Sequence, residues 1–212
     1  VMKKVIMVTA ALVAASALAP AAYGSGKVVV VGAPVARSVV PWRGASGNSM
    51  RFQCLWFQRD IDHAGNVNRV EFDKVYADGG RFNSVRVWLC RTRKTALEST
   101  FANNYTGFTP VQVLNMRSTA VSGAGWFDLR ITAGRFNYNN RNNLLMEIRW
   151  DGDDGSDVRC WRSGQPYSRC YAFNHNASQG TVYNNGQRIR LTMGTMVGLE
   201  PTSLGRVKTL FQ

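Results

Sequence analysis

Four aspartates crowd one short segment and are the first residues that could do chemistry. They are Asp151, Asp153, Asp154 and Asp157, separated by glycine and serine. Carboxylate oxygens at such close spacing suit a hard cation, so the segment is a possible calcium site. It departs from the EF-hand loop, because Gly155 stands where that pattern needs a third ligand and no glutamate closes the site. The alternative is a solvated hairpin loop, since Asp and Gly are ordinary turn residues.

The cysteines form the second candidate group: Cys54, Cys90, Cys160 and Cys170. An even number of cysteines in an exported chain, which the leader described below predicts, favours disulfides over free thiols. A glycine and a proline mark a turn between the last two, so we expect Cys160 to pair with Cys170 across a hairpin, and Cys54 with Cys90 by elimination. A four-thiolate zinc site is the alternative, but neither pair has the short spacing of structural zinc motifs.

Aromatic and arginine side chains beside that predicted loop are the candidate ligand-binding residues. They are Trp161, Arg162, Tyr167 and Arg169. Aromatic rings of this kind form stacking platforms in sugar-binding β-sandwiches, whereas most tryptophans of a sandwich serve its core. We therefore expect a possible exposed binding patch at this loop.

No residue pattern names a reaction. The two histidines, His63 and His175, belong to no triad motif, and the chain has no Gly-x-Ser-x-Gly, His-Glu-x-x-His or glycine-rich phosphate loop. Carboxylates such as Asp73, Asp128 and Glu147 could supply a glycosidase pair, but its required separation cannot be read from sequence. For Glu147 an ion pair is the simpler expectation. We expect no catalysis and, calcium apart, no cofactor.

The charge balance is strongly basic, with a formal net charge of +13. Such a surface attracts polyanions without selecting one. The arginines are scattered singly through alternating patterns rather than gathered in one run, so we expect no specific nucleic-acid binding. The partners expected are a polyanionic or glycan surface, or copies of the same chain.

Short alternating patterns, punctuated by Gly, Asn and Asp, predict strands along most of the chain. The expected strands are residues 50–57, 67–76, 84–90, 111–114, 125–132, 143–150, 158–162, 169–174, 180–183 and 188–191, with one helical turn within 95–103. Nine or ten strands with little helix predict an all-β fold, a two-sheet antiparallel β-sandwich.

Two turns predict hairpins in addition to the one at the last two cysteines. The Asp62–Asn66 turn is expected to join residues 50–57 to 67–76. Asn184-Asn185-Gly186 is expected to join residues 180–183 to 188–191, because Asn-Gly supplies the positive φ angles of a tight hairpin turn.

The N-terminal residues predict export. Lys3 and Lys4 precede an apolar run at residues 5–18 and then small residues, the layout of a signal peptide over residues 1–24, cleaved after Ala21 or Gly24. That run is too short to span a bilayer comfortably, and we expect no transmembrane segment in the mature chain. The protein is expected to be secreted, extracellular or at the bacterial cell surface.

Three further segments complete the predicted organisation. Residues 25–49 are an extended segment, either an edge strand of the chain's own sheet or a strand donated to a neighbour. Residues 50–198 form the β-sandwich domain. Residues 199–212 are a C-terminal tail with an amphipathic turn or helix.

A longer pattern points to a family. Gly125-Trp126-Phe127, then Phe136-Asn137-Tyr138, then Asn143-Leu144-Leu145-Met146-Glu147-Ile148 resembles jelly-roll-like β-sandwich modules of secreted, surface or adhesin-like proteins of environmental bacteria. The resemblance covers about residues 50–195 and implies location and fold more than activity. We expect a non-catalytic extracellular surface, structural or adhesion module. The alternatives are a carbohydrate-binding module that uses exposed aromatics, and a fibre subunit assembled by N-terminal strand donation.

Overall fold

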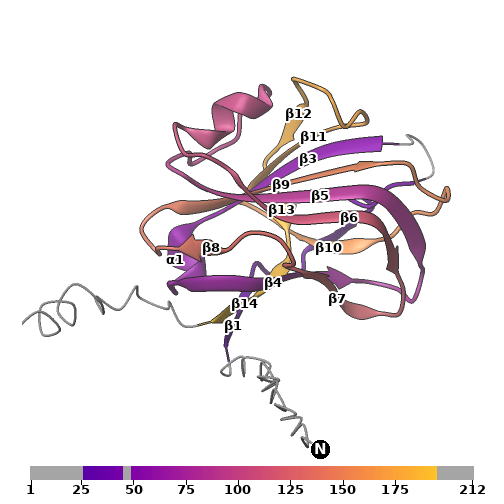
Figure 1. Cartoon of the computed structure of the whole chain (residues 1–212), viewed down its shortest axis with the longest axis horizontal. Helices are drawn as coiled ribbons and strands as arrows, with labels where there is room; N and C mark the ends of the chain where they lie inside the picture. Colours follow the sequence, from indigo (N-terminus) through magenta and orange to yellow (C-terminus); the bar gives the residue numbers. More distant parts are fainter. Residues whose placement is uncertain (1–25, 45–48, 195–212) are drawn as a thin grey trace, which may run out of the picture.

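The computed structural model describes residues 26–44 and 49–194, which form two antiparallel β-sheets packed against each other (Figure 1). The expected all-β sandwich is therefore confirmed. The predicted signal peptide and C-terminal tail lie outside the described residues. Within the described part of the chain, no helix has the length and apolar character needed to cross a membrane.

The first sheet has eight strands. They are β1 (Lys27–Val31), β2 (Ala36–Ser38), β4 (Gly65–Lys74), β7 (Gly125–Arg130), β8 (Phe136–Tyr138), β10 (Cys160–Ser163), β13 (Gly186–Gln187) and β14 (Ile189–Gly194). Their order is β1-β14-β4-β10-β13, with β2 paired to β10 and both β7 and β8 paired to β4. The N-terminal strand β1 pairs with β14 of the same chain and leaves Val28 and Val30 exposed.

The second sheet has six strands and carries the features on which function depends. They are β3 (Ser49–Trp56), β5 (Gly80–Thr92), β6 (Val111–Val121), β9 (Asn143–Asp151), β11 (Ser168–Ala172) and β12 (Thr181–Tyr183), in the order β12-β11-β3-β9-β5-β6. Two short helices join the strands, α1 (Gln58–Ile61) and the 3-10 helix η1 (Phe101–Tyr105), which overlaps the expected helical turn. The described residues thus hold more strands than the nine or ten expected, because β1, β2, β8 and β13 are also strands.

All three expected hairpins are wrong in the same way. The expected partners were β3 with β4, β10 with β11, and β12 with β14, yet in each case the two strands belong to different sheets, and β13 also lies between β12 and β14. Each turn therefore carries the chain across the sandwich. The physical reason is that an alternating pattern shows that a strand has a buried face, but either sheet can present that face.

The main core lies between the sheets, around the fully buried Trp42. Its ring centroid lies 5.2 Å from that of Phe82, 5.2 Å from that of Phe127 and 5.8 Å from that of Phe72. A second, smaller apolar cluster lies on the outer face of the six-stranded sheet, where the segment that includes η1 covers it. The middle of this sheet is therefore buried on both faces, which explains the almost continuous burial of β3 and β9.

The cysteine prediction is wrong, because all four cysteines are free and buried. Cys54 and Cys160 belong to the main core, whereas Cys90 and Cys170 belong to the outer cluster. The six-stranded sheet therefore separates the two side chains of each expected pair, and Cys160 itself belongs to β10 of the other sheet. In addition, β9 lies between the strands of Cys54 and Cys90. A disulfide needs Cα atoms within about 7 Å and side chains that point toward each other. Burial raises the pKa of Cys54 and Cys90 to about 12 and that of Cys170 to about 11.

Candidate functional site

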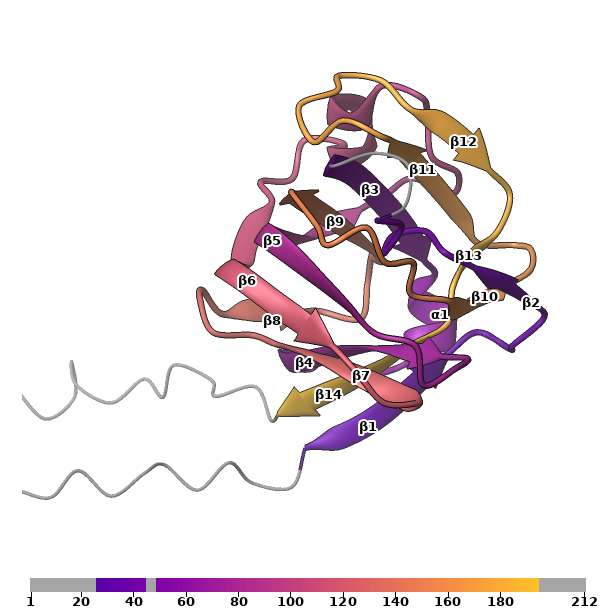
Figure 2. The same ribbon diagram turned by 90° about the vertical axis from the view of Figure 1, so that its right-hand side faces the viewer.

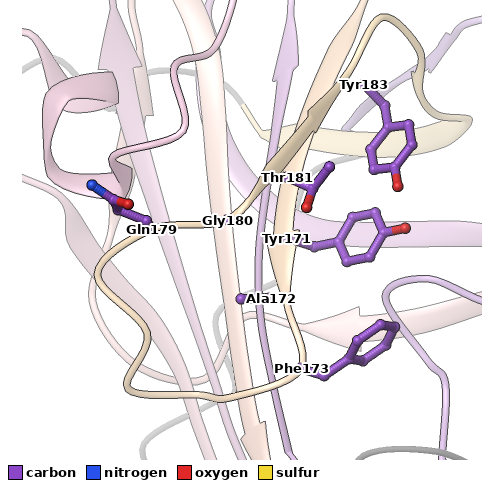
Figure 3. Close-up of a pocket in the computed structure, with 7 residues that line it drawn as sticks. All are labelled: Tyr171, Ala172, Phe173, Gln179, Gly180, Thr181 and Tyr183. Atoms are coloured by element: carbon purple, nitrogen blue, oxygen red, sulfur yellow. The ribbon is translucent and has the colours of Figure 1, made fainter.

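A shallow hollow of about 400 Å³ opens to solvent at the β12 edge of the six-stranded sheet. Figure 2 places β11 and β12 at the end of that sheet far from β1 and β14. Its lining consists of Tyr171, Ala172, Phe173, Gln179, Gly180, Thr181 and Tyr183 (Figure 3). We call this feature the Tyr171 hollow.

The pairing of β11 with β12 brings the aromatic rings together. Tyr171 lies opposite Thr181 in the antiparallel register, so Tyr183 is its diagonal neighbour on the same face. The rings of Tyr171 and Tyr183 are stacked, with centroids 5.2 Å apart and planes 8° from parallel. Phe173 follows two residues after Tyr171, and its ring meets that of Tyr171 edge-on at 5.6 Å. The rings of β11, of β12 and of the residue just past the end of β11 therefore form one row (Figure 3).

The row is anchored at one end and exposed at the other. Tyr171 is partly buried and packs against the main core. Phe173 and Tyr183 are 40% and 38% exposed, which is unusual for large aromatic side chains of this fold. Gly180 lets the chain approach closely here, because a Cβ at this position would lie 2.7 Å from the carbonyl oxygen of Tyr171 and 2.8 Å from the ring of Phe101. The backbone therefore fixes the position of β12.

Two arginines stand against the rings. The guanidinium carbon of Arg169 lies 5.6 Å from the ring centroid of Tyr171 and 5.5 Å from that of Tyr183. Arg43 lies 5.1 Å from the ring centroid of Phe173. Cations at these distances are attracted to aromatic faces. Burial lowers the pKa of Arg169, whereas burial and a hydrogen bond with Tyr183 raise the pKa of Tyr171. Each of the three rings therefore has an arginine beside it.

The side chains that line the hollow are mainly aromatic and neutral polar groups. Among the described residues that line it, none is a carboxylate, an imidazole or a thiol. The rings offer apolar faces, while the hydroxyl of Thr181 and the amide of Gln179 can exchange hydrogen bonds with ligand hydroxyls. A few polar groups placed around apolar surface are typical of ligand sites.

The four residues of the binding patch predicted from sequence do not lie together in the structure. Trp161 is half-buried on β10, with Arg37 lying 5.7 Å from its ring centroid, and Arg162 follows it on the same strand. Tyr167 is only 8% exposed and packs against Phe57. Arg169 is 5% exposed and lies under the tyrosines of the hollow, where it donates a 2.7 Å hydrogen bond to a serine of β2. Of the four residues, only Arg169 reaches the candidate site.

The aspartate segment is arranged as a turn. The carboxylates of Asp153 and Asp154 each accept the backbone N–H two residues ahead, at 2.6 and 3.1 Å, as turn residues do. Asp151 lies 3.4 Å from Nδ1 of His175, and Asp157 takes part in an isolated backbone bridge. Across residues 26–44 and 49–194, no group of three or more His, Cys, Asp or Glu side chains is arranged to hold a metal. The calcium prediction therefore gains no support from the geometry.

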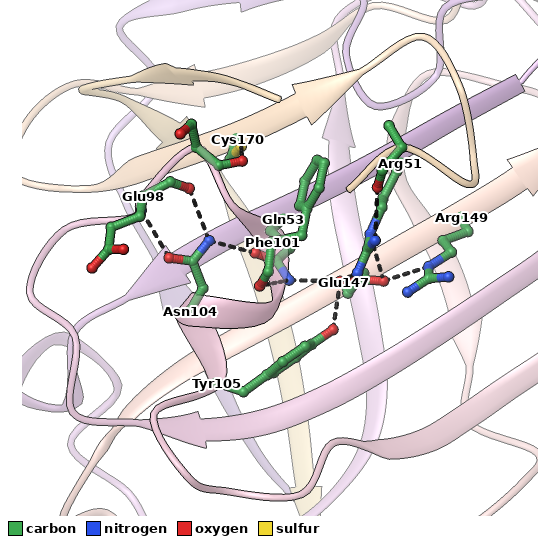
Figure 4. A network of polar contacts seen from close by, with 11 residues as sticks. Arg51, Gln53, Glu98, Phe101, Asn104, Tyr105, Glu147, Arg149 and Cys170 are labelled. Atoms are coloured by element: carbon green, nitrogen blue, oxygen red, sulfur yellow. Dashed lines mark hydrogen bonds and ion pairs between the residues drawn. The ribbon is translucent and has the colours of Figure 1, made fainter. Parts of the chain in front are cut away.

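A buried carboxylate organises the outer face of the six-stranded sheet (Figure 4). The side chain of Glu147 is fully buried and accepts two hydrogen bonds from Arg51, both at 3.1 Å, and one from Gln53 at 2.6 Å. Arg149 and the hydroxyl of Tyr105 also donate to it. Burial and the charge of Glu147 raise the pKa of Tyr105. The expected ion pair at Glu147 is thus present.

This network attaches the η1 segment to the sheet. Asn104 donates to the side-chain oxygen of Gln53 at 2.8 Å and to the carbonyl oxygen of Glu98 at 3.0 Å. The amide of Gln53 also donates to the carbonyl oxygen of Phe101. Since donors of the sheet and of η1 surround Glu147, we assign this carboxylate a structural role.

Sequence reasoning missed the aromatic row, although part of its signal was visible. Arg169, Tyr171 and Phe173 alternate within the range 169–174 that the sequence predicts as a strand, so they are expected on one face. The contribution of Tyr183 depends on the β11–β12 register, which no turn pattern revealed. In comparisons with known proteins, no protein-family model matches this chain, and no curated protein is found to be similar. The resemblance to bacterial surface modules stays a prediction.

Proposed function

We propose that this chain is a non-catalytic extracellular surface or adhesion module that binds polysaccharide through the Tyr171 hollow. The observation that carries the proposal is the row of Tyr171, Phe173 and Tyr183 at an open edge of the sandwich, in which Tyr183 stacks on Tyr171, Phe173 meets Tyr171 edge-on, and the two outer rings are exposed. The C–H face of a sugar ring is apolar, so it can lie on such a row while the sugar hydroxyls stay at its polar border.

The shape of the hollow suits an extended chain rather than an enclosed small molecule. Its openness lets a polymer enter and leave along the edge of the sheet, and the row spans several rings rather than one. Burying about 50 Å² of apolar ring surface on a sugar contributes about 1.3 kcal/mol, which is nearly tenfold in affinity. Several such contacts along one polymer give the attachment strength expected of an adhesion module.

The test is affinity electrophoresis in gels that contain neutral or acidic polysaccharides, followed by calorimetry with the best binder. Tyr183→Ala is the test variant, and we expect it to weaken binding about tenfold. Tyr76→Ala is the matched control, since Tyr76 is 40% exposed and also contacts an arginine, Arg37, but lies beside Trp161 and outside the hollow. The control should bind like the unaltered protein.

Two results would overturn the proposal. If the unaltered protein binds none of the polysaccharides, the hollow is not a glycan site. If Tyr76→Ala weakens binding and Tyr183→Ala does not, the ligand binds beside Trp161, as the sequence first indicated. Fibre assembly by strand donation is less well supported, because β1 already pairs with β14 of its own chain.

A further inference from the structure

Three arginines stand side by side across the outer face of the six-stranded sheet. Arg149 of β9 lies directly opposite Arg51 of β3 on one side and directly opposite Arg86 of β5 on the other. Like charges in direct cross-strand positions destabilise a sheet. Nearby negative charge is therefore needed to offset the repulsion among these three guanidinium groups.

The described residues supply only part of that charge. Glu147 pairs with Arg51 and Arg149. Arg86 makes no ion pair with any described residue, and its Nε is buried without a hydrogen-bond partner. On the next strand, Arg117 is exposed and lies two residues from the position opposite Arg86, so it shares that face. The face holds more guanidinium groups than carboxylates.

Trp88 holds two of these guanidinium groups in place. Arg149 lies 5.0 Å and Arg86 6.0 Å from the centroid of its ring. A guanidinium that stacks on an aromatic face keeps its N–H edges available for other partners. The ring thereby positions two arginines with free donor capacity near each other.

A similar cluster on the other sheet shows what full compensation looks like. Trp126 also lies near two arginines, Arg188 at 5.0 Å and Arg190 at 4.8 Å from its ring centroid. There each arginine has its own carboxylate, Asp73 for Arg188 and Glu71 for Arg190. Two arginines can therefore stack on a tryptophan while each is paired with a carboxylate. The unbalanced positive charge around Trp88 needs a separate explanation.

We propose that Arg86, Arg149, Arg117 and Trp88 form a binding site for a doubly charged oxyanion, a sulfate or phosphate group. Planar guanidinium forks match the paired oxygens of such groups and make short charge-assisted hydrogen bonds to them. The site is separate from the Tyr171 hollow, since Tyr171 packs against the core between the sheets and Trp88 lies opposite Glu147 on the outer face.

The test follows the indole N–H signals of the tryptophans by NMR, with the Trp88 signal assigned through Trp88→Phe. Inorganic sulfate and inorganic phosphate are titrated separately, against sodium chloride at matched ionic strength. We expect saturable shifts of the Trp88 signal with both dianions, or with only one of them if the site distinguishes sulfate from phosphate. The Trp126 signal should change little. Trp126 is an internal control with the same stacking and balanced charge.

Charge-matched variants locate the effect. Arg86→Gln should weaken dianion binding about tenfold, the size expected for losing a hydrogen bond to a charged group. Arg117→Gln should also weaken it, at an exposed position that leaves the buried network intact. The control Arg141→Gln removes the same charge from an exposed loop and should bind normally. Equal responses from all three variants, or shifts at Trp88 that match those with chloride, would refute the site.

Discussion

The sharpest prediction concerns the buried carboxylate of Glu147, which holds the η1 segment on the six-stranded sheet. Glu147→Gln keeps the size of the side chain but removes its charge and replaces one acceptor oxygen with a donor. The side chain that it leaves behind is Arg51, which is 9% exposed and whose ion pair is with Glu147. An amide group would also face the donors of Gln53 and Tyr105.

The expected loss in free energy of unfolding follows from the burial of this ion pair. Removing one partner of a buried ion pair leaves an uncompensated buried charge, which costs about 3–5 kcal/mol. A domain of this size has a free energy of unfolding of about 5–15 kcal/mol, so the variant should lose a large share of its stability. The control Glu98→Gln makes the same chemical change in the η1 segment, where the carboxylate is exposed and pairs with Lys94, and it should move the urea midpoint little.

The assay is equilibrium unfolding in urea, followed by tryptophan fluorescence and far-ultraviolet circular dichroism. The reasoning predicts a large fall in midpoint for Glu147→Gln and an unchanged slope. A loss below about 1 kcal/mol would refute it, because Arg51 would then be adequately solvated or paired without the carboxylate. A double variant that also carries Arg51→Met should recover part of the loss, since it removes the unpaired charge.

Three further predictions follow from burial. Ellman's reagent should detect four thiols in the unfolded protein and react slowly with the native one, because burial raises the pKa values of the cysteines. If no thiols are detected after unfolding without reductant, the cysteines are paired in disulfides and the prediction is wrong. Stability should be complete below about pH 9 and fall as pH rises toward 12, because burial raises the pKa of Cys54 from 9.0 and that of Tyr167 from 10.0, both to about 12, and the unfolded chain loses these protons first; ionisation of all seven tyrosines near pH 10 with circular dichroism intact would contradict this. Gly180→Ala should cost about 1–3 kcal/mol in urea unfolding, since its Cβ would meet backbone and the ring of Phe101; a neutral effect would show that β12 moves freely.

The sequence was informative about strands and weak about their partners. The ranges 50–57 and 143–150 match β3 and β9 within a residue, because polar and apolar residues alternate there and both ranges hold aromatic residues that favour strands. The same alternation did not reveal that both faces of these strands are buried. Asn185-Gly186 illustrates the limit. The dipeptide was expected to close a tight hairpin turn, but neither residue has a positive φ, and Gly186 begins β13 of the other sheet. Local turn chemistry does not specify the sheet that the next strand joins.

The candidate site shows the same limit at the level of side chains. Arg169 was identified and does contact the aromatic row, while Tyr167 and Trp161 were placed beside it only because they are near it in sequence. The cysteine pairs failed because residues 160 and 170 were assumed to face each other across a hairpin. Proximity along the chain predicted contact only where consecutive strands share a sheet, and in this fold the turn in question joins two sheets.

Glycan binding at the Tyr171 hollow is best tested by NMR of the protein with labelled aromatic rings, titrated with an oligosaccharide of the best-binding polysaccharide. We expect saturable shifts of the ring signals of Tyr171, Phe173 and Tyr183, with those of Tyr76 and Trp161 unchanged. Shifts confined to Tyr76 and Trp161, or none at any ring while calorimetry reports binding, would contradict it.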